Sequence, residues 1–363
     1  MSHALLLAAA ARICRLAAAI LPRPMRRWGA AMQHELPGIT NGREALAFAL
    51  GCFGCALRMA IAFHLTHDLP ARPRAMVIAC AAGATGLGLV HLVASGAPLR
   101  HAATNAAALL LAILAAAALQ RPSRLSAGPL GILLALSLVA TALLGTSVDG
   151  ASRWIAVGGL FLQPSLLIVP ALTIRFARTR DPLSAAGVAL CALALALQPD
   201  RAMAGALTAA LAALLLLRPE RTVLLALGAA ATAFASTLAK ADLPDAPPLL
   251  LTAFSVHPLA GLAVFAGAAL ILLPAIAGRI HDAANREAYT IFGALWLAVI
   301  VASVLGNAPM PLVGYGGSAI LGYVLSLLGL PRHAAAAPAR GQESPSPSPV
   351  GEPHLKAALA PAR

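Results

Sequence analysis

The chain has 363 residues, of which 60% are hydrophobic and only 11% are charged. Soluble domains carry roughly 25% charged residues, so the composition excludes an ordinary soluble protein and indicates a polytopic membrane protein. The net charge of +13 does not indicate a nucleic-acid-binding protein, because the arginines lie in short loops between apolar segments and form no basic stripe with interleaved aromatic residues. An alternating strand pattern is absent, which favours an all-α membrane helix bundle over a membrane barrel.

Residues 1–74 form a prefix with two apolar stretches, 4–21 and 44–65, and both contain arginine. Two arginines interrupt the first stretch, so we expect no cleaved signal peptide. In the second, Arg58 lies near the middle, where an arginine costs about 2.5–3.5 kcal/mol in a spanning helix. We therefore expect both stretches to be amphipathic helices at the membrane interface. The alternative is that 44–65 spans the membrane.

Five cysteines are present, and Cys52 and Cys55 form a C-x-x-C pair. The pair lies in an apolar helical stretch without a second pair nearby, which predicts packing cysteines rather than a redox or metal site. We expect no metal and no cofactor.

From residue 75 the sequence contains ten apolar segments separated by short polar connections. They are 75–96, 103–119, 128–146, 155–174, 183–197, 202–217, 222–239, 255–277, 288–306 and 312–330. Several are shorter than the ~20 residues that a perpendicular span needs. The pattern predicts a membrane domain of about ten transmembrane helices over residues 75–330.

The basic residues of the connections are distributed unequally between the two sides. One set of connections holds Arg72, Arg74, Arg121, Arg124, Arg175, Arg178, Arg180, Arg218, Arg221, Arg279, Arg286 and Arg332. The alternate connections hold one basic residue each, at Arg100, Arg153, Arg201 and Lys240. Because cytoplasmic loops carry the excess of basic residues, we expect the first set and both termini to be cytoplasmic. Residues 331–363 are rich in Ala, Pro and Ser, which predicts a disordered cytoplasmic tail.

Three short polar islands interrupt the apolar segments. They are 150–165, which contains G-A-S-R-W and Q-P-S; 198–200, which reads Q-P-D; and 314–318, which reads G-Y-G-G-S. A membrane protein tolerates such groups only where they line a cavity, face water or contact a ligand. In the expected topology all three lie on the extracytoplasmic face, which predicts one composite site.

The islands resemble motifs of the SEDS family (shape, elongation, division and sporulation), which includes FtsW, RodA and SpoVE. That family has a G-A-x-R-W-I…Q-P-S-E run after its third span, Q-P-D at the end of its fifth, and P-x-P-x-x-S-Y-G-G-S before its tenth. The corresponding runs here are 150–165, 198–200 and 309–318, in the same order. The resemblance covers roughly residues 75–330.

The resemblance implies a cell-wall function at the bacterial cytoplasmic (inner) membrane, in cell division or cell shape. Family members polymerise peptidoglycan glycan strands from lipid II, an undecaprenyl-diphosphate-linked glycan, usually with a transpeptidase partner. An older proposal made them lipid II flippases. The ligand-binding residues that the resemblance suggests are Arg153, Trp154, Gln163, Ser165, Gln198, Asp200, Tyr315 and Ser318.

The chain departs from the family pattern at four places. Leu166 stands where Q-P-S-E has its Glu, Arg201 follows the Q-P-D motif in place of Leu, and Gly314 replaces a Ser. The family's long loop between spans seven and eight bears the catalytic Asp, whereas here the connection 240–254 is short and Pro-rich. Its two acids, Asp242 and Asp245, are the weak candidates for catalysis.

Glycan extension needs a base for the acceptor hydroxyl and cations for the departing diphosphate. The cations are present, but the base expected from the family is not recognisable. One hypothesis is therefore a divergent relative that binds a lipid-linked glycan precursor or a partner protein. The alternative is an active lipid II-dependent glycosyltransferase, and a weaker one is a precursor transporter. Each motif also has a simpler interpretation: an interfacial anchor at Arg153 and Trp154, a turn at 198–200, and close packing at Gly316 and Gly317.

Overall fold

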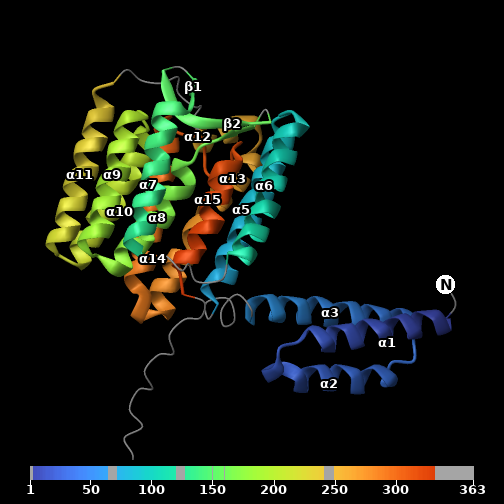
Figure 1. Cartoon of the computed structure of the whole chain (residues 1–363). Helices are drawn as coiled ribbons and strands as arrows, with labels where there is room; N and C mark the ends of the chain where they lie inside the picture. Colours follow the sequence, from blue (N-terminus) through green and yellow to red (C-terminus); the bar gives the residue numbers. More distant parts are fainter. Residues whose placement is uncertain are drawn as a thin grey trace, which may run out of the picture.

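The computed structural model describes residues 3–63, 72–119, 127–148, 150–158, 160–240 and 249–331 (Figure 1). Three helices precede a bundle of near-parallel helices, and a small sheet covers one end of the bundle. The prefix helices are α1 (His3–Ile20), α2 (Arg26–Glu35) and α3 (Gly42–Phe63). The bundle comprises α5 (Pro73–Ala94), α6 (Leu99–Ala118), α7 (Ala127–Leu144), α8 (Ser165–Thr179), α9 (Pro182–Leu197), α10 (Arg201–Leu217), α11 (Arg221–Leu238), α12 (Leu249–Val256), α13 (Pro258–His281), α14 (Arg286–Val304) and α15 (Gly317–Ser326).

The prediction of a polytopic helix bundle is confirmed. Each of the ten apolar segments contributes one bundle helix within the described ranges, from 10 residues in α15 to 24 in α13, and α12 is an additional helix of 8 residues. Among the residues that the structure describes, six helices are long and apolar enough to cross a membrane: α1, α5, α6, α11, α13 and α14 with the turn before it. Four further apolar helices, α7, α9, α10 and α15, are shorter.

The fourth predicted segment, 155–174, is wrong in its first half. Residues of that half belong to a three-stranded antiparallel sheet made of β1 (Thr146–Val148), β2 (Ala151–Val157) and β3 (Leu160–Leu162). Gly158, at φ +57°, makes the turn between β2 and β3, and Pro164 stands at the N-cap of α8. A short apolar run does not by itself distinguish strand from helix.

The tenth predicted segment, 312–330, also begins too early. The chain is not helical before Gly317, because Leu312 adopts φ +62° and Gly316 adopts φ +150°. Positive φ ends any helix. The loop 309–316 precedes α15. It lies at the same end of the bundle as the sheet, because Ser318 at the start of α15 bonds Gln163, which follows β3.

Close helix contacts through small residues hold the bundle together. At Gly322 of α15, a Cβ atom would lie 1.9 Å from the carbonyl oxygen of Leu166 in α8, so only glycine fits there. At Gly88 of α5, a Cβ atom would lie 2.5 Å from the carbonyl oxygen of Val313. Such contacts are typical of membrane helices, whose packing depends on close backbone approach. Trp296, Tyr289 and Tyr323 are the largest side chains that are fully buried among the helices.

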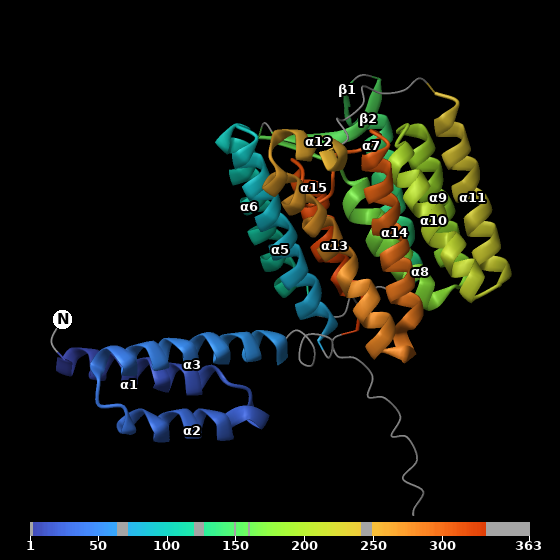
Figure 2. The ribbon, with the colours of Figure 1, turned by 180° about the vertical axis from the view of Figure 1, so that it is seen from behind.

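The prefix helices form a separate group that runs across the bundle axis at the end opposite the sheet (Figures 1 and 2). Helix α1 packs against both α3 and α2. Ala10 and Cys14 of α1 are buried against Ala45 and Ala49 of α3. The division into prefix, bundle and tail stays a prediction, and residues 332–363 lie outside the described residues.

The pairing of α1 with α3 gives the first prediction. Cys14 of α1 is buried in the contact with α3, and the partly buried Cys52 of α3 packs against the same cluster. We expect mild oxidation to cross-link Cys14 to Cys52 in a variant whose other cysteines are serine, with a protease site inserted at Gly38. The cleaved fragments should remain joined on a non-reducing gel.

The matched control retains Cys14 and Cys55 with Cys52→Ser, because Cys55 is exposed. Cross-linking in this control to the same extent as in the first variant would contradict the helix pairing.

Candidate functional site

The three polar islands meet around one buried carboxylate. Asp200 is completely buried, and its Oδ2 accepts hydrogen bonds from Ser165 Oγ at 2.6 Å and Gln163 Nε2 at 2.9 Å. Its Oδ1 accepts from the backbone N–H of Met203 at 3.2 Å, which makes Asp200 the N-cap of α10. The second island thus lies directly against the first.

The third island joins the same cluster through Ser318 in the first turn of α15. Ser318 is buried, and its hydroxyl accepts a hydrogen bond from the backbone N–H of Gln163 at 2.9 Å. A chain of contacts therefore runs from α15 through Gln163 to α10. The sequence prediction that these residues share one end of the bundle agrees with this geometry.

Arg153 approaches the cluster from strand β2. Its Nη1 lies 4.0 Å from Asp200 Oδ1, and its side chain is 15% exposed. Its guanidinium carbon lies 4.4 Å from the ring centre of Trp154, a cation–π contact. Its buried Nε has no hydrogen-bond partner among the described residues. The guanidinium is therefore held by a ring and a carboxylate while it retains donors for a ligand.

Gln198 is placed apart from this cluster. It is completely buried, and its Nε2 donates to the carbonyl oxygen of Leu138 in α7 at 2.8 Å. Its Oε1 has no partner within the described ranges. The contact ties the C-terminal end of α9 to α7, so this residue stabilises the helix pair that supports the site.

Tyr315 stands in the loop before α15 and is 47% exposed. Its ring stacks on His101 of α6, with ring centres 4.0 Å apart and planes inclined by 28°. One turn later in α6, buried Asn105 donates to the carbonyl oxygen of Gly314 at 2.8 Å and accepts from the N–H of Gly316 at 3.2 Å. One asparagine thus fixes the loop on either side of Tyr315.

His101 and Asn105 are residues that the sequence analysis missed. An asparagine inside an apolar helix was the available signal, since such a group is costly in a membrane unless it is hydrogen-bonded. Its partners lie more than 200 positions away in the chain, at Gly314 and Gly316, so the sequence offered no means of naming them.

Two other cations at this end of the bundle are bound to helix ends. Lys240 Nζ donates to the carbonyl oxygen of Ala196 at 2.7 Å, and Arg201 donates to that of Thr237 at 3.3 Å. Cations stabilise the carbonyl ends of helices, so these two side chains have structural roles. Asp242 and Asp245 lie outside the described residues.

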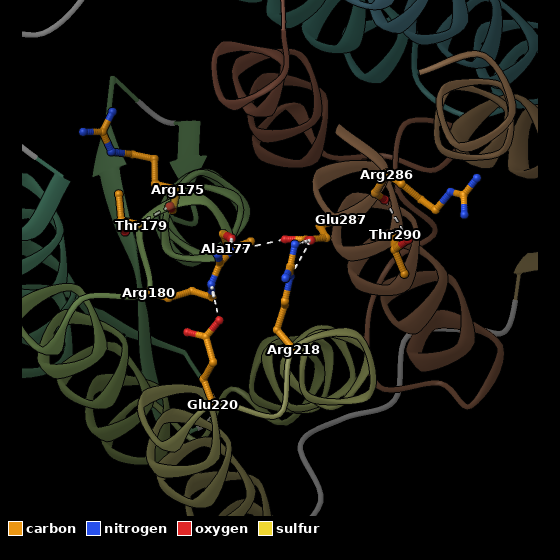
Figure 3. Close-up of polar contacts among 9 residues, drawn as sticks. All are labelled: Arg175, Ala177, Thr179, Arg180, Arg218, Glu220, Arg286, Glu287 and Thr290. Carbon is orange, nitrogen blue, oxygen red and sulfur yellow. Dashed lines mark hydrogen bonds and ion pairs between the residues drawn. The ribbon is translucent and has the colours of Figure 1, made fainter. Parts of the chain in front are cut away.

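An ionic network that no motif indicated lies at the opposite end of α8 (Figure 3). Glu287 accepts from Arg218 at 2.6 Å and from Arg180 at 3.2 Å, and Arg180 also pairs with Glu220 at 3.0 Å. The pairs connect the end of α8, the connection between α10 and α11, and the start of α14. Nearby, Asp181 caps α9, and the hydroxyl of Ser184 holds the pKa of Asp181 below its usual range.

Glu287 is the centre of this network and gives the second prediction. Partly exposed ion pairs contribute about 0.2–1 kcal/mol each, and Glu287 takes part in two of them whereas Glu220 takes part in one. We expect Glu287→Gln to lower the free energy of unfolding by about 1 kcal/mol and Glu220→Gln by less. Thermal unfolding in detergent at low and high salt measures both variants. Equal losses in the two variants would contradict a central role for Glu287.

Comparison with known proteins identifies the fold. The chain matches no protein-family model and no curated protein sequence. Among solved structures it resembles the rod shape determining protein RodA of Thermus thermophilus, with 21% identity and a TM-score of 0.50 over 69% of this chain and 93% of that one. A mutant of the same RodA gives 22% identity and a TM-score of 0.50 over 69% and 94%. The chain therefore has the fold of RodA, a polytopic helical membrane protein, and the SEDS-like fold that its motifs indicated is confirmed.

Proposed function

We propose that the chain is a divergent SEDS-family protein that binds a polyprenyl-diphosphate-linked glycan and acts in cell-wall organisation, in cell shape or division. One observation carries the proposal. Residues of the three motifs converge on one carboxylate, where Asp200 is bonded to Gln163 and Ser165, Arg153 lies 4.0 Å away, and Ser318 bonds Gln163. Turns that only connect helices need not share hydrogen bonds, whereas residues that line one ligand site lie together.

Arg153 is the residue that binds the diphosphate in this proposal. A guanidinium offers a planar set of donors that matches phosphate oxygens, and the contacts with Trp154 and Asp200 fix its orientation before a ligand arrives. The proposal includes the orientation of the bundle, with the motif end extracytoplasmic and the basic end cytoplasmic in the bacterial inner membrane. A transpeptidase partner belongs to it on the strength of the motif resemblance.

Asp200 acts as a positioning residue in this proposal. Its carboxylate is completely buried and already accepts three hydrogen bonds, so it is not placed to take a proton from an acceptor hydroxyl. This favours binding without efficient glycan polymerisation. The alternative, an active lipid II-dependent glycosyltransferase, would need Asp242 or Asp245 as the base.

Removal of Arg153 gives the third prediction. We expect Arg153→Ala to weaken binding of lipid II to the purified protein in nanodiscs by about tenfold or more, since a hydrogen bond to a charged group contributes roughly 1.5–3 kcal/mol. The matched control is Arg221→Ala, which removes an exposed arginine at the other end of the bundle. Equal affinity of the two variants would overturn the assignment of Arg153.

The same preparation tests catalysis. We expect no glycan polymer from lipid II, because a general base contributes about 10²–10⁴-fold and none is recognisable. Polymer that forms and is abolished by Asp242→Ala or Asp245→Ala would replace the binding function with the active glycosyltransferase. Transport of the precursor across vesicles by the wild-type chain would favour the transporter alternative.

The fourth prediction concerns the sugar. His101 covers one face of the Tyr315 ring, and the ring remains 47% exposed, so a pyranose can stack on the open face. If that contact is worth as much as an aromatic pair, about 0.5–1.5 kcal/mol, Tyr315→Ala should weaken lipid II binding roughly 2- to 10-fold. Tyr315→Phe should bind as tightly as wild type.

A binding titration with undecaprenyl diphosphate, which carries no sugar, distinguishes a sugar contact of Tyr315 from a role in supporting the loop. We expect Tyr315→Ala to leave its affinity unchanged. A loss with this ligand as large as the loss with lipid II would mean that Tyr315 supports the loop and makes no sugar contact.

A further inference from the structure

The three prefix helices differ in the surfaces that they leave open. Helix α1 lies between α2 and α3 and packs against both. Helix α2 is the most polar of the three and exposes Arg26 and Arg27. Helix α3 is apolar on the side that contacts α1 and also on the opposite side, which is unusual for a helix at the edge of a water-soluble group.

The two sides of α3 follow from helical periodicity. Ala45, Ala49 and Ala56 lie on one side and are buried against α1. On the opposite side lie Ala47, Leu50, Gly54 and Leu57, all exposed, with Leu50 55% and Leu57 43% accessible. We call this opposite side the outer face of α3.

An arginine stands at each end of the outer face. Arg43 and Arg58 are exposed, and the spacing of 15 residues places them roughly 22 Å apart on the same side of the helix. Between them, Gly51, Gly54 and Leu57 line a shallow groove. The pattern of apolar centre and basic ends matches a helix that lies in a lipid surface.

The position of α3 in the molecule agrees with that pattern. In both views α3 is the prefix helix nearest the bundle, it lies across the bundle axis, and it is level with the end opposite the sheet (Figures 1 and 2). Helix α2 lies on the far side of α1. With the bundle in a membrane, α3 is at the membrane surface and α2 extends away from it.

The charge of the prefix favours an anionic lipid surface over a second copy of the chain as the partner of the outer face. Residues 3–63, which form the three prefix helices and their connections, contain seven arginines and two acids, Glu35 and Glu44. A second copy of the chain would bring two positively charged prefixes together, whereas an anionic lipid surface attracts each basic residue by about 1 kcal/mol.

We propose that the outer face of α3 binds the anionic lipid surface of the leaflet at the basic end of the bundle. Leu50 and Leu57 enter the boundary between headgroups and acyl chains, and Arg43 and Arg58 pair with lipid phosphates. Helices α1 and α2 support α3 from the water side. This refines the expectation that both apolar stretches of the prefix are interfacial, because it assigns the contact with lipid to one face of α3, the side opposite α1.

Fluorescence quenching on the full chain in nanodiscs of phosphatidylglycerol tests the proposal. A polarity-sensitive probe is attached at Cys55, which is exposed and borders the groove, with the other cysteines replaced by serine. The matched probe is placed at Ala31, which is exposed on α2. We expect lipids with a shallow spin label to quench the probe at Cys55, and aqueous iodide to quench the probe at Ala31.

Three outcomes would overturn the proposal. Quenching of Cys55 by iodide alone would place α3 in water. Quenching strongest with a spin label at the bilayer centre would make α3 a spanning helix. Protection from both quenchers that rises with the number of chains in each disc would assign the outer face to a second copy.

Charge variants provide a readout independent of probe position. We expect Arg43→Gln and Arg58→Gln each to lower the ratio of lipid-bound to unbound α3 about fivefold in anionic discs, and to have no effect in phosphatidylcholine discs. The control pair is Arg26→Gln and Arg27→Gln on α2, which should change this ratio little. Equal effects of the two pairs would mean that the arginines act through net charge alone, and the assignment of the outer face would fail.

Discussion

The buried carboxylate of Asp200 is the constraint on which the rest of this site depends. A charged group in a low-dielectric interior is costly unless it is paired and hydrogen-bonded. Here the donors come from Ser165, Gln163 and the N-terminus of α10, and the cation is Arg153. Because these groups come from different segments, the carboxylate requires the first two motifs to meet, and Ser318 fixes the third against Gln163.

The same constraint distinguishes residues that stabilise the site from residues that could take part in a reaction. A carboxylate that stabilises a junction of segments is committed to accepting hydrogen bonds, and that commitment keeps it from acting as a base. The cations divide in the same way. Arg201 and Lys240 donate hydrogen bonds to helix carbonyls. Arg153 instead lies over the Trp154 ring and 4.0 Å from the Asp200 carboxylate. This division among the cations is the reason that the proposed function gives Arg153 the role of binding an anion.

Much of the bundle and part of the site could be predicted from the sequence, for different reasons. Apolar segment length predicted the helices, and polar groups inside an apolar chain predicted the meeting of Gln163, Ser165 and Asp200. The strands at 151–157 and 160–162 could not be predicted, because an apolar run carries no sign of its partner strand. Asn105 and His101 were missed because their partners, Gly314, Gly316 and Tyr315, are distant in sequence.

Helix α8 connects the site to the ionic network at the opposite end of the bundle. Its N-terminus carries Ser165, and its C-terminus is anchored through Arg180 to Glu220 and Glu287. Gly322 lets α15 approach the Leu166 carbonyl so closely that a Cβ atom would be 1.9 Å away. Ser318 lies one turn before Gly322 on the same side of α15, so this backbone contact sets the distance from Ser318 to Gln163. The hydrogen bond that joins the third motif to the first thus depends on a glycine that lies outside both motifs.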